Sequence, residues 1–275
     1  MASRISAVSW PRLFLLLPLV VGCQPIYVST PAFVPILNGK GDGYGSVALS
    51  TTHDGPIVAQ AAYAPIGHLM LMADGMVTPS ENDSFYSKQS AFDAGLGYFT
   101  ALSKAGRFAL LGGAGAGHTE FSLDVSPTTP SFLLGIPNSA GTDFLNGQMN
   151  FHRYFLETDL GFANDAFMAG TSLRYTFLHA YAYHATALHR SYYGPFRDSM
   201  GHLLQADSVT YTPDEGIKDS QIFDLVFFAS ARLTAFQMGS VYPWFTFQVD
   251  IPNVQSGFDV KVPSGMMSLS LGIRF

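Results

Sequence analysis

Hydrophobic and polar residues alternate with a period of two along most of this chain. The clearest case is GMMSLSLGIRF at the end of the sequence, and the same alternation recurs over 165–177 and 223–234. Successive side chains of a β-strand point to opposite faces, so the pattern predicts strands. Ten are predicted, over residues 44–52, 57–65, 68–78, 90–102, 107–122, 147–162, 166–182, 221–235, 241–250 and 264–275.

The distribution of charge indicates which face of these strands meets water. A sheet face in contact with water normally carries several lysines, and the polar faces here hold mainly Gly, Ala, Ser, Thr and Gln, as the inside of a narrow barrel does. All five lysines fall in predicted connections or in the N-terminal segment: Lys40, Lys88, Lys104, Lys218 and Lys261.

The connections alternate between tight and long. Those after the second, fourth, sixth and eighth strands are tight, whereas 124–145 and 183–220 are long. Outer-membrane barrels show this asymmetry, with short periplasmic turns and long extracellular loops. The predicted fold class is therefore all-β: an antiparallel, transmembrane up-and-down β-barrel of about 10 strands (8 to 12), over residues 43–275.

The N-terminus has the features of a cleaved signal. Two arginines precede an apolar run that begins at Leu13 and is too short to span a bilayer permanently. Cys23 is the only cysteine, so it has no disulfide partner within the chain. The ending LVVGC resembles a lipoprotein lipobox, which implies a signal peptide over 1–22, a covalent lipid on Cys23 and a lipidated tether over 23–42. An ordinary secretory signal and an uncleaved anchor stay open.

Strand parity fixes the expected side of that lipid. Counting strands places both Cys23 and Phe275 at the end with the tight turns. We therefore expect an integral outer-membrane barrel with its lipid anchor on the periplasmic side. A net charge of -6 without a basic block argues against a nucleic-acid partner.

Inward-facing charges are the main candidate functional feature. Buried charges must be paired or solvated, so we expect a ladder of ion pairs that fills the lumen. A selectivity ring in a small pore and acid–base chemistry are the alternatives. The network is expected to contain Arg153, Glu157, Asp159, Arg174, Asp224, Arg232 and Arg274.

Other candidate chemistry is weaker. His179, His184 and His189 recur at intervals of five, which puts three imidazoles on one face of neither a strand nor a helix, so an aromatic girdle is favoured over a metal site. His202 with Asp207, Asp214 and Glu215 could form a calcium site or a protease-like dyad. His189 and Ser191 could form a Ser–His catalytic pair, but no third member is identifiable. The glycine run 112–117 could suggest a phosphate loop, but it lacks the lysine and the following helix. We expect no catalytic residue, no metal and no cofactor besides the lipid on Cys23.

Three segments carry a family resemblance: CQPIYVSTPAFVPIL, AQAAYAPIGHLMLMADG and YFLETDLGF. They resemble outer-membrane β-barrel lipoproteins of Gram-negative bacteria, often described only as porin-like. The resemblance implies contact with outer-membrane lipid and with the barrel-assembly and lipoprotein-sorting machinery, and it brings no catalytic set. Phe275 resembles the barrel-assembly signal, although Ile273 stands where an aromatic residue is usual.

The predicted function is that of a non-enzymatic outer-membrane barrel lipoprotein. Its lumen is expected to be filled with charges, and its surface-exposed loops to serve structural, adhesive or partner-binding roles. A small porin or ligand-uptake channel, an outer-membrane hydrolase and a soluble periplasmic β-lipoprotein stay open as alternatives.

Overall fold

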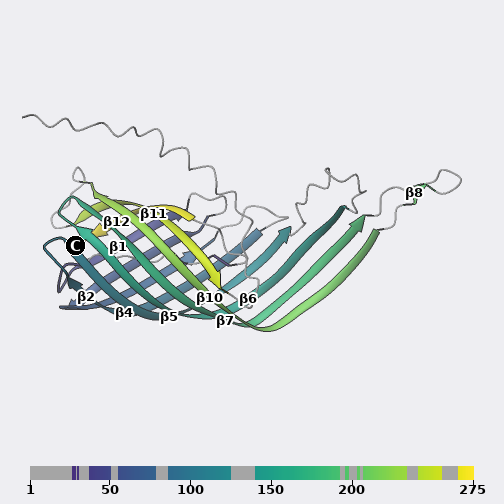
Figure 1. Cartoon of the computed structure of the whole chain (residues 1–275), viewed down its shortest axis with the longest axis horizontal. Helices are drawn as coiled ribbons and strands as arrows, with labels where there is room; N and C mark the ends of the chain where they lie inside the picture. Colours follow the sequence, from purple (N-terminus) through teal and green to yellow (C-terminus); the bar gives the residue numbers. More distant parts are fainter. Residues whose placement is uncertain are drawn as a thin grey trace, which may run out of the picture.

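The computed structural model is a closed antiparallel β-barrel (Figure 1). It describes residues 27–28, 30, 37–50, 55–78, 86–124, 140–192, 196–197, 203–204, 207–233, 241–255 and 266–275. No helix among these residues is long and apolar enough to cross a membrane. The predicted signal peptide over 1–22 and Cys23 after it lie outside the described residues, so the division at residues 22 and 42 stays a prediction.

Ten strands form the barrel, and their order follows the sequence around it until the last strand pairs with the first. The strands are β1 (Gly43–Ser50), β2 (Ile57–Ile66), β3 (Leu69–Val77), β4 (Tyr86–Ala101), β5 (Gly106–Asp124), β6 (Ala140–Ala163), β7 (Phe167–Tyr192), β10 (Asp207–Arg232), β11 (Tyr242–Gln255) and β12 (Met266–Arg274). Two short strands, β8 (Phe196–Arg197) and β9 (Leu203–Leu204), pair with each other in the connection between β7 and β10. The predicted fold class and strand count are confirmed.

The outer surface of the barrel is apolar around its whole circumference. Burial alternates along the strands, and the apolar side chains that face outward are too large and too continuous for a surface in contact with water. Each strand of the barrel contributes at least one exposed large side chain: Val47, Tyr63, Leu71, Leu96, Leu110, Leu156, Leu173, Phe227, Phe245 and Leu271. This belt is the surface that faces lipid.

Three strands are much longer than a membrane requires. β6 has 24 residues, and β7 and β10 have 26 each. A tilted strand rises about 2.5 Å per residue along the barrel axis, so 26 residues rise about 65 Å, twice the hydrocarbon thickness of about 30 Å. The upper parts of β6, β7 and β10 therefore form a sheet beyond the loop end, which Figure 1 shows projecting from the barrel. We call it the loop-end sheet.

The expected long loop over 183–220 is therefore wrong in its bounds. β7 continues to Tyr192 and β10 begins at Asp207, so only the residues between them connect the two strands. Register shifts between Asn150 and Phe151 and between Gly216 and Lys218 interrupt the pairing. A bulge reverses which face each later side chain occupies, so a strict period of two is lost there although the strand continues.

The N-terminal segment enters the barrel. Leu37 packs at the turn end in a cluster with Ala64, Met70 and Leu111. Tyr27 and Val28 belong to a second cluster in the half of the barrel nearer the loops, which includes Met76, Phe121 and Phe151. The described residues of this segment therefore pass through the lumen, whereas the sequence analysis expects an extended tether at the turn side.

Candidate functional site

The centre of the lumen holds a cluster of buried ionisable side chains. All are between 0 and 4 % exposed, and they comprise six carboxyl groups and two arginines: Asp74, Asp93, Glu157, Asp159, Asp224, Asp250, Arg153 and Arg174. Five of the seven expected members are therefore present. We call this set the lumen network.

Arg174 is the most highly connected member of the network. It lies in register between Glu157 on β6 and Asp224 on β10. Its Nε donates to Glu157 Oε2 at 2.6 Å, and its guanidinium lies 3.8 Å from Asp74 and 3.7 Å from Asp93. The guanidinium also stacks over the Phe155 ring at 4.3 Å from the centroid. One cation thus connects carboxylates on both sides of the lumen.

Arg153 forms the second centre. Its Nε donates to Asp93 Oδ1 at 2.5 Å, and its Nη1 donates to the Tyr27 hydroxyl at 2.8 Å. Asp93 itself lies directly opposite Asp74 in the pairing of β3 with β4. Like charges directly opposite each other destabilise a sheet, so the two arginines are needed to hold these carboxylates in place.

The N-terminal segment is bound within this network by hydrogen bonds. The Gln89 side chain accepts from Val28 N–H and donates to Val28 C=O, each at 2.8 Å. Arg174 donates to the Thr30 carbonyl oxygen at 3.3 Å. The Tyr27 ring packs edge-on against Phe151, with centroids 5.3 Å apart. These contacts occupy the lumen with main chain as well as with side chains.

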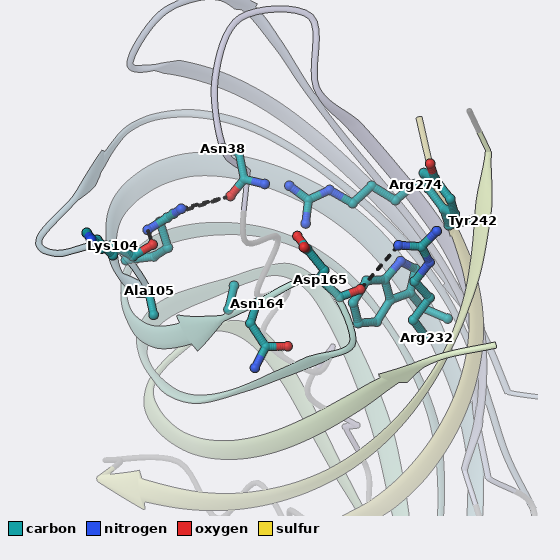
Figure 2. Close-up of a pocket in the computed structure, with 11 residues that line it drawn as sticks. Asn38, Lys104, Ala105, Asn164, Asp165, Arg232, Tyr242 and Arg274 are labelled. Carbon is teal, nitrogen blue, oxygen red and sulfur yellow. Dashed lines mark hydrogen bonds between the residues drawn. The ribbon is translucent and has the colours of Figure 1, made fainter. Parts of the chain in front are cut away.

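Arg232 and Arg274 do not join the lumen network, which corrects the sequence analysis. Both lie in a cavity of about 480 Å³ at the turn end, which Figure 2 shows. Arg274 pairs with Asp42, with Nη2 2.5 Å from Oδ2. Arg232 stacks on Tyr242 at 3.5 Å from the ring centroid. Alternation correctly predicts that both side chains face inward, but it does not give their position along the barrel axis. Arg232 follows Asp224 by eight residues, about 20 Å along the axis.

Three acidic residues of the network were missed by sequence reasoning: Asp74, Asp93 and Asp250. Each lies on the inward face of its own strand, so the same alternation could have located them. Asp74 and Asp93 lie on the early strands β3 and β4, and Asp250 lies on β11 between the strands that carry the expected members. A narrow barrel brings together inward residues that are far apart in sequence, so every strand can contribute to the network.

The histidines of β7 pair with acids on β10. His179 Nδ1 lies 2.6 Å from Asp219 Oδ1, and His184 Nδ1 lies 3.5 Å from Glu215 Oε1. Asp214 pairs with Lys218 at 2.7 Å. Asp214 and Glu215 therefore have partners on the loop-end sheet other than His202, which lies outside the described residues. The strands that carry His189, Ser191 and Asp207 are described, but the side chains of these three residues are not among the described side chains.

Among the described residues, no group of three or more His, Cys, Asp or Glu side chains is arranged to hold a metal ion. The glycine run 112–117 lies within β5, so these residues form a segment of a strand with small side chains.

Comparisons with known proteins place the chain only by its fold. No protein-family model matches, and no curated protein matches. The outer-membrane protease OmpT from Escherichia coli is similar, with a TM-score of 0.39 and 9 % identity, over 86 % of this chain and 93 % of that one. The CymD monoaromatic hydrocarbon channel is similar with a TM-score of 0.31 and 7 % identity, over 86 % and 88 % of the chains. These comparisons give the resemblance to a lipoprotein family no support.

The expectation that the protein is not an enzyme is corrected at this point. OmpT, one of the similar barrels, is a protease, so similarity of fold gives no reason to exclude catalysis. At 9 % identity and a TM-score of 0.39, the likeness concerns the fold and assigns no activity to this chain. The two neighbours differ in role, so the specific role has to be argued from the chain's own residues.

Proposed function

We propose that this integral outer-membrane barrel acts through its loop-end sheet, as a surface for a structural, adhesive or partner-binding role, while its lumen is a closed structural core. The observation that carries the proposal is the length of β6, β7 and β10, which rise far beyond a bilayer. Building such an extension costs conformational entropy for every ordered residue. A barrel that served only as a pore would not need it.

The side chains of the loop-end sheet fit a surface in water. On its outer face, His179 and His184 of β7 pair across the strands with Asp219 and Glu215 of β10. Asp214 and Lys218 pair with each other along β10, on the face of Tyr183. The inner positions hold a small core: Phe121, Met149, Tyr183 and Ala185. Burial raises the pKa of Tyr183 to about 12, and the nearby Asp214 carboxylate adds to the shift, so this phenol is neutral in any physiological medium.

Contacts within the lumen support a closed core. The Val28 main chain, the Tyr27 ring and the lumen network share the space between β4, β6 and β7. Conductance in planar bilayers tests this point. The folded mature protein should give no steady conductance at low voltage, and an open ohmic pore in the wild type would reject the closed-core proposal.

The role of the loop-end sheet requires its own test. Replacing residues 188–211 by an Asn-Gly turn joins Ala187 to Thr212, which are partners in the pairing of β7 with β10. The shortened barrel should fold and keep its heat-modifiable migration on gels. In cells that lack the gene, it should fail to restore the surface phenotypes that the full chain restores. Full restoration would show that the tip of the loop-end sheet is dispensable.

A gated channel is the second candidate, and the charge of the lumen favours it. Six carboxyl groups face two arginines in the described lumen network, so a path opened there would attract cations. Removal of residues 24–36 would open that path. A cation-selective conductance in this deletion variant, together with voltage-dependent opening of the wild type, would favour the channel over the surface role.

Lipidation of Cys23 is part of the proposal. The LVVGC sequence and the lack of a disulfide partner within the chain support it. It implies processing by the lipoprotein-sorting machinery and insertion by the barrel-assembly machinery. The intact mass of the mature protein should include an acylated cysteine, and Cys23→Ser should remove that mass while the barrel stays in the membrane.

A further inference from the structure

The cavity at the turn end is lined by eleven residues, of which four are cations and one is an acid. The four cations come from different parts of the barrel: Lys104 from the turn before β5, Arg107 from β5, Arg232 from the end of β10 and Arg274 from the end of β12. Asp165, in the turn between β6 and β7, is the one acidic side chain among the described residues that line it. Figure 2 shows Arg232 and Arg274 on one side of the cavity, Lys104 on the other and Asp165 between them.

The contacts of these cations leave the cavity positively charged. Arg274 is neutralised by Asp42, to which it donates from both Nε and Nη2. Arg107 donates to neutral acceptors: the Asn38 side chain and the carbonyls of Ser103 and Gly106. Hydrogen bonds to carbonyls orient a guanidinium without cancelling its charge, so the field in the cavity stays positive.

Trp244 gives a second, independent indication of a ligand. The residue lines the cavity and is 3 % exposed, and its Nε1 is buried without a hydrogen-bond partner among the described residues. A buried donor that lacks an acceptor destabilises the fold, so native structures almost always supply one. An oxygen of a bound anion would be such an acceptor.

We propose that the turn-end cavity binds a phosphate group, supplied either by free phosphate or by a phospholipid headgroup of the inner leaflet. Arginine suits this ligand because its planar guanidinium matches the oxygens of a phosphate. Two contacts orient the Arg232 guanidinium: it stacks on the Tyr242 ring, and it donates to the Asp165 carbonyl oxygen at 3.3 Å. The cavity, at about 480 Å³, admits a headgroup and excludes folded macromolecules.

The chain itself supplies a probe for this proposal. It has two tryptophans, Trp10 and Trp244, and Trp10 lies within the predicted signal peptide. A protein that begins at residue 24, without the signal peptide and Cys23, therefore reports the cavity through the fluorescence of Trp244 alone. In a phosphate-free detergent at constant ionic strength, replacing chloride by inorganic phosphate should give a saturable change in fluorescence. Dihexanoyl phosphatidylglycerol below its micellar concentration provides the second titration.

The two titrations distinguish the sources of phosphate. A response to inorganic phosphate assigns the site to the free anion, and a response to the soluble phospholipid alone assigns it to a headgroup. If neither ligand gives a saturable fluorescence change, or saturable uptake in equilibrium dialysis, while gel migration shows a folded barrel, the cavity is no phosphate site.

Variants test the residues individually by equilibrium dialysis. Arg232→Gln should weaken phosphate binding at least tenfold and Arg232→Lys less, because a charged hydrogen bond is lost in the first and a charge is kept in the second. Trp244→Phe keeps the packing and removes the donor, and it should weaken binding several-fold. Lys88→Gln removes a charge at the loop end and should leave binding unchanged. Equal affinity in Arg232→Gln and the wild type would overturn the assignment.

Discussion

Arg153 on β6 reaches Asp93 on β4 across the strand that separates them, with Nε 2.5 Å from Oδ1. Gly115 on β5 is the register partner of both residues. A Cβ atom at Gly115 would collide with the Asp93 carboxylate and with the Phe92 carbonyl. The glycine therefore makes room for the ion pair, which gives the glycine run of β5 a structural role.

Gly115→Ala should destabilise the barrel, because the added methyl group has to displace the Asp93 carboxylate or the backbone. Overpacking of this kind costs about 1–3 kcal/mol in the free energy of unfolding. Gly112→Ala is the matched control, since its Cβ would meet only the Phe155 carbonyl oxygen at 3.7 Å, an ordinary contact. Urea unfolding of both variants in detergent measures the difference. Equal midpoints would show that β5 adapts without strain.

Arg174→Met should be the most damaging single change in the lumen network. It leaves Glu157, Asp74 and Asp93 without their shared cation, and removing one partner of a buried ion pair costs about 3–5 kcal/mol. Arg232→Met is the comparison. It removes a cation–π contact and a hydrogen bond at the turn end, which together contribute about 1–2 kcal/mol. The midpoint of heat-modifiable gel migration should fall further for Arg174→Met, and the reverse order would place the main cation at the turn end.

Much of this fold follows from the alternation of residues, because a period of two fixes both the strand and the face of each side chain. The face of a strand on which a residue lies does not give its position along the barrel axis. For this reason the sequence places Arg232 and Arg274 in the lumen network with Arg174, although they lie at the turn end. The bulge at Tyr181 adds one residue to β7, so the inward face changes from even-numbered residues up to Ala180 to odd-numbered residues from Tyr183. The strict alternation that identifies a strand is lost there, and the pattern does not reveal that β7 and β10 continue. The binding of Tyr27 and Val28 inside the lumen depends on contacts with Arg153 and Gln89, more than 60 residues away in sequence.

Gln89→Leu should loosen the N-terminal segment, because it removes both hydrogen bonds to Val28 while it keeps a similar side-chain volume. Two hydrogen bonds at about 1 kcal/mol each shift an opening equilibrium by about tenfold to thirtyfold. In a Cys23→Ser background, Thr30→Cys reports the opening through its rate of reaction with a hydrophilic maleimide. Thr119→Val is the control, since Thr119 lies opposite Gln89 and its buried hydroxyl makes no hydrogen bond among the described residues. A rate unaffected by Gln89→Leu would show that other contacts hold the segment.

Trypsin should distinguish the two ends of the barrel. Arg197 lies in β8, within the connection between β7 and β10, and Lys104 lies in the tight turn between β4 and β5. Added to intact cells, trypsin should cut after Arg197 and spare Lys104, because long connections at the aqueous end are the most accessible to proteases. Lys218 should also resist, since it is part of β10 and pairs with Asp214. Cleavage at Lys104 in sealed cells would reverse the assigned topology.

The start of the mature chain should lie on the same side as the loop-end sheet. Val28 binds Gln89, whose main-chain carbonyl accepts from Thr78 N–H directly after β3, so Val28 lies at the upper rim of the β3–β4 pair. Leu37 lies at the turn end, so Val28 lies nearer the loop end than Leu37 does.

Residue 23 is five residues before Val28 and, at about 3.5 Å per residue, lies within about 18 Å of it. Gln89 lies twelve residues before Ala101, the last residue of β4, at the turn end. At about 2.5 Å per residue along the barrel axis, Gln89 is about 30 Å from the turn end, which is farther than residue 23 can reach from Val28. From this reach we expect a lipid on Cys23 to enter the outer leaflet, whereas strand parity alone predicts the periplasmic side. An epitope inserted after Gln24 in Cys23→Ser should bind antibody on intact cells as strongly as an epitope inserted after Arg197. An epitope at residue 24 that becomes detectable only after permeabilisation would return the N-terminus to the periplasm.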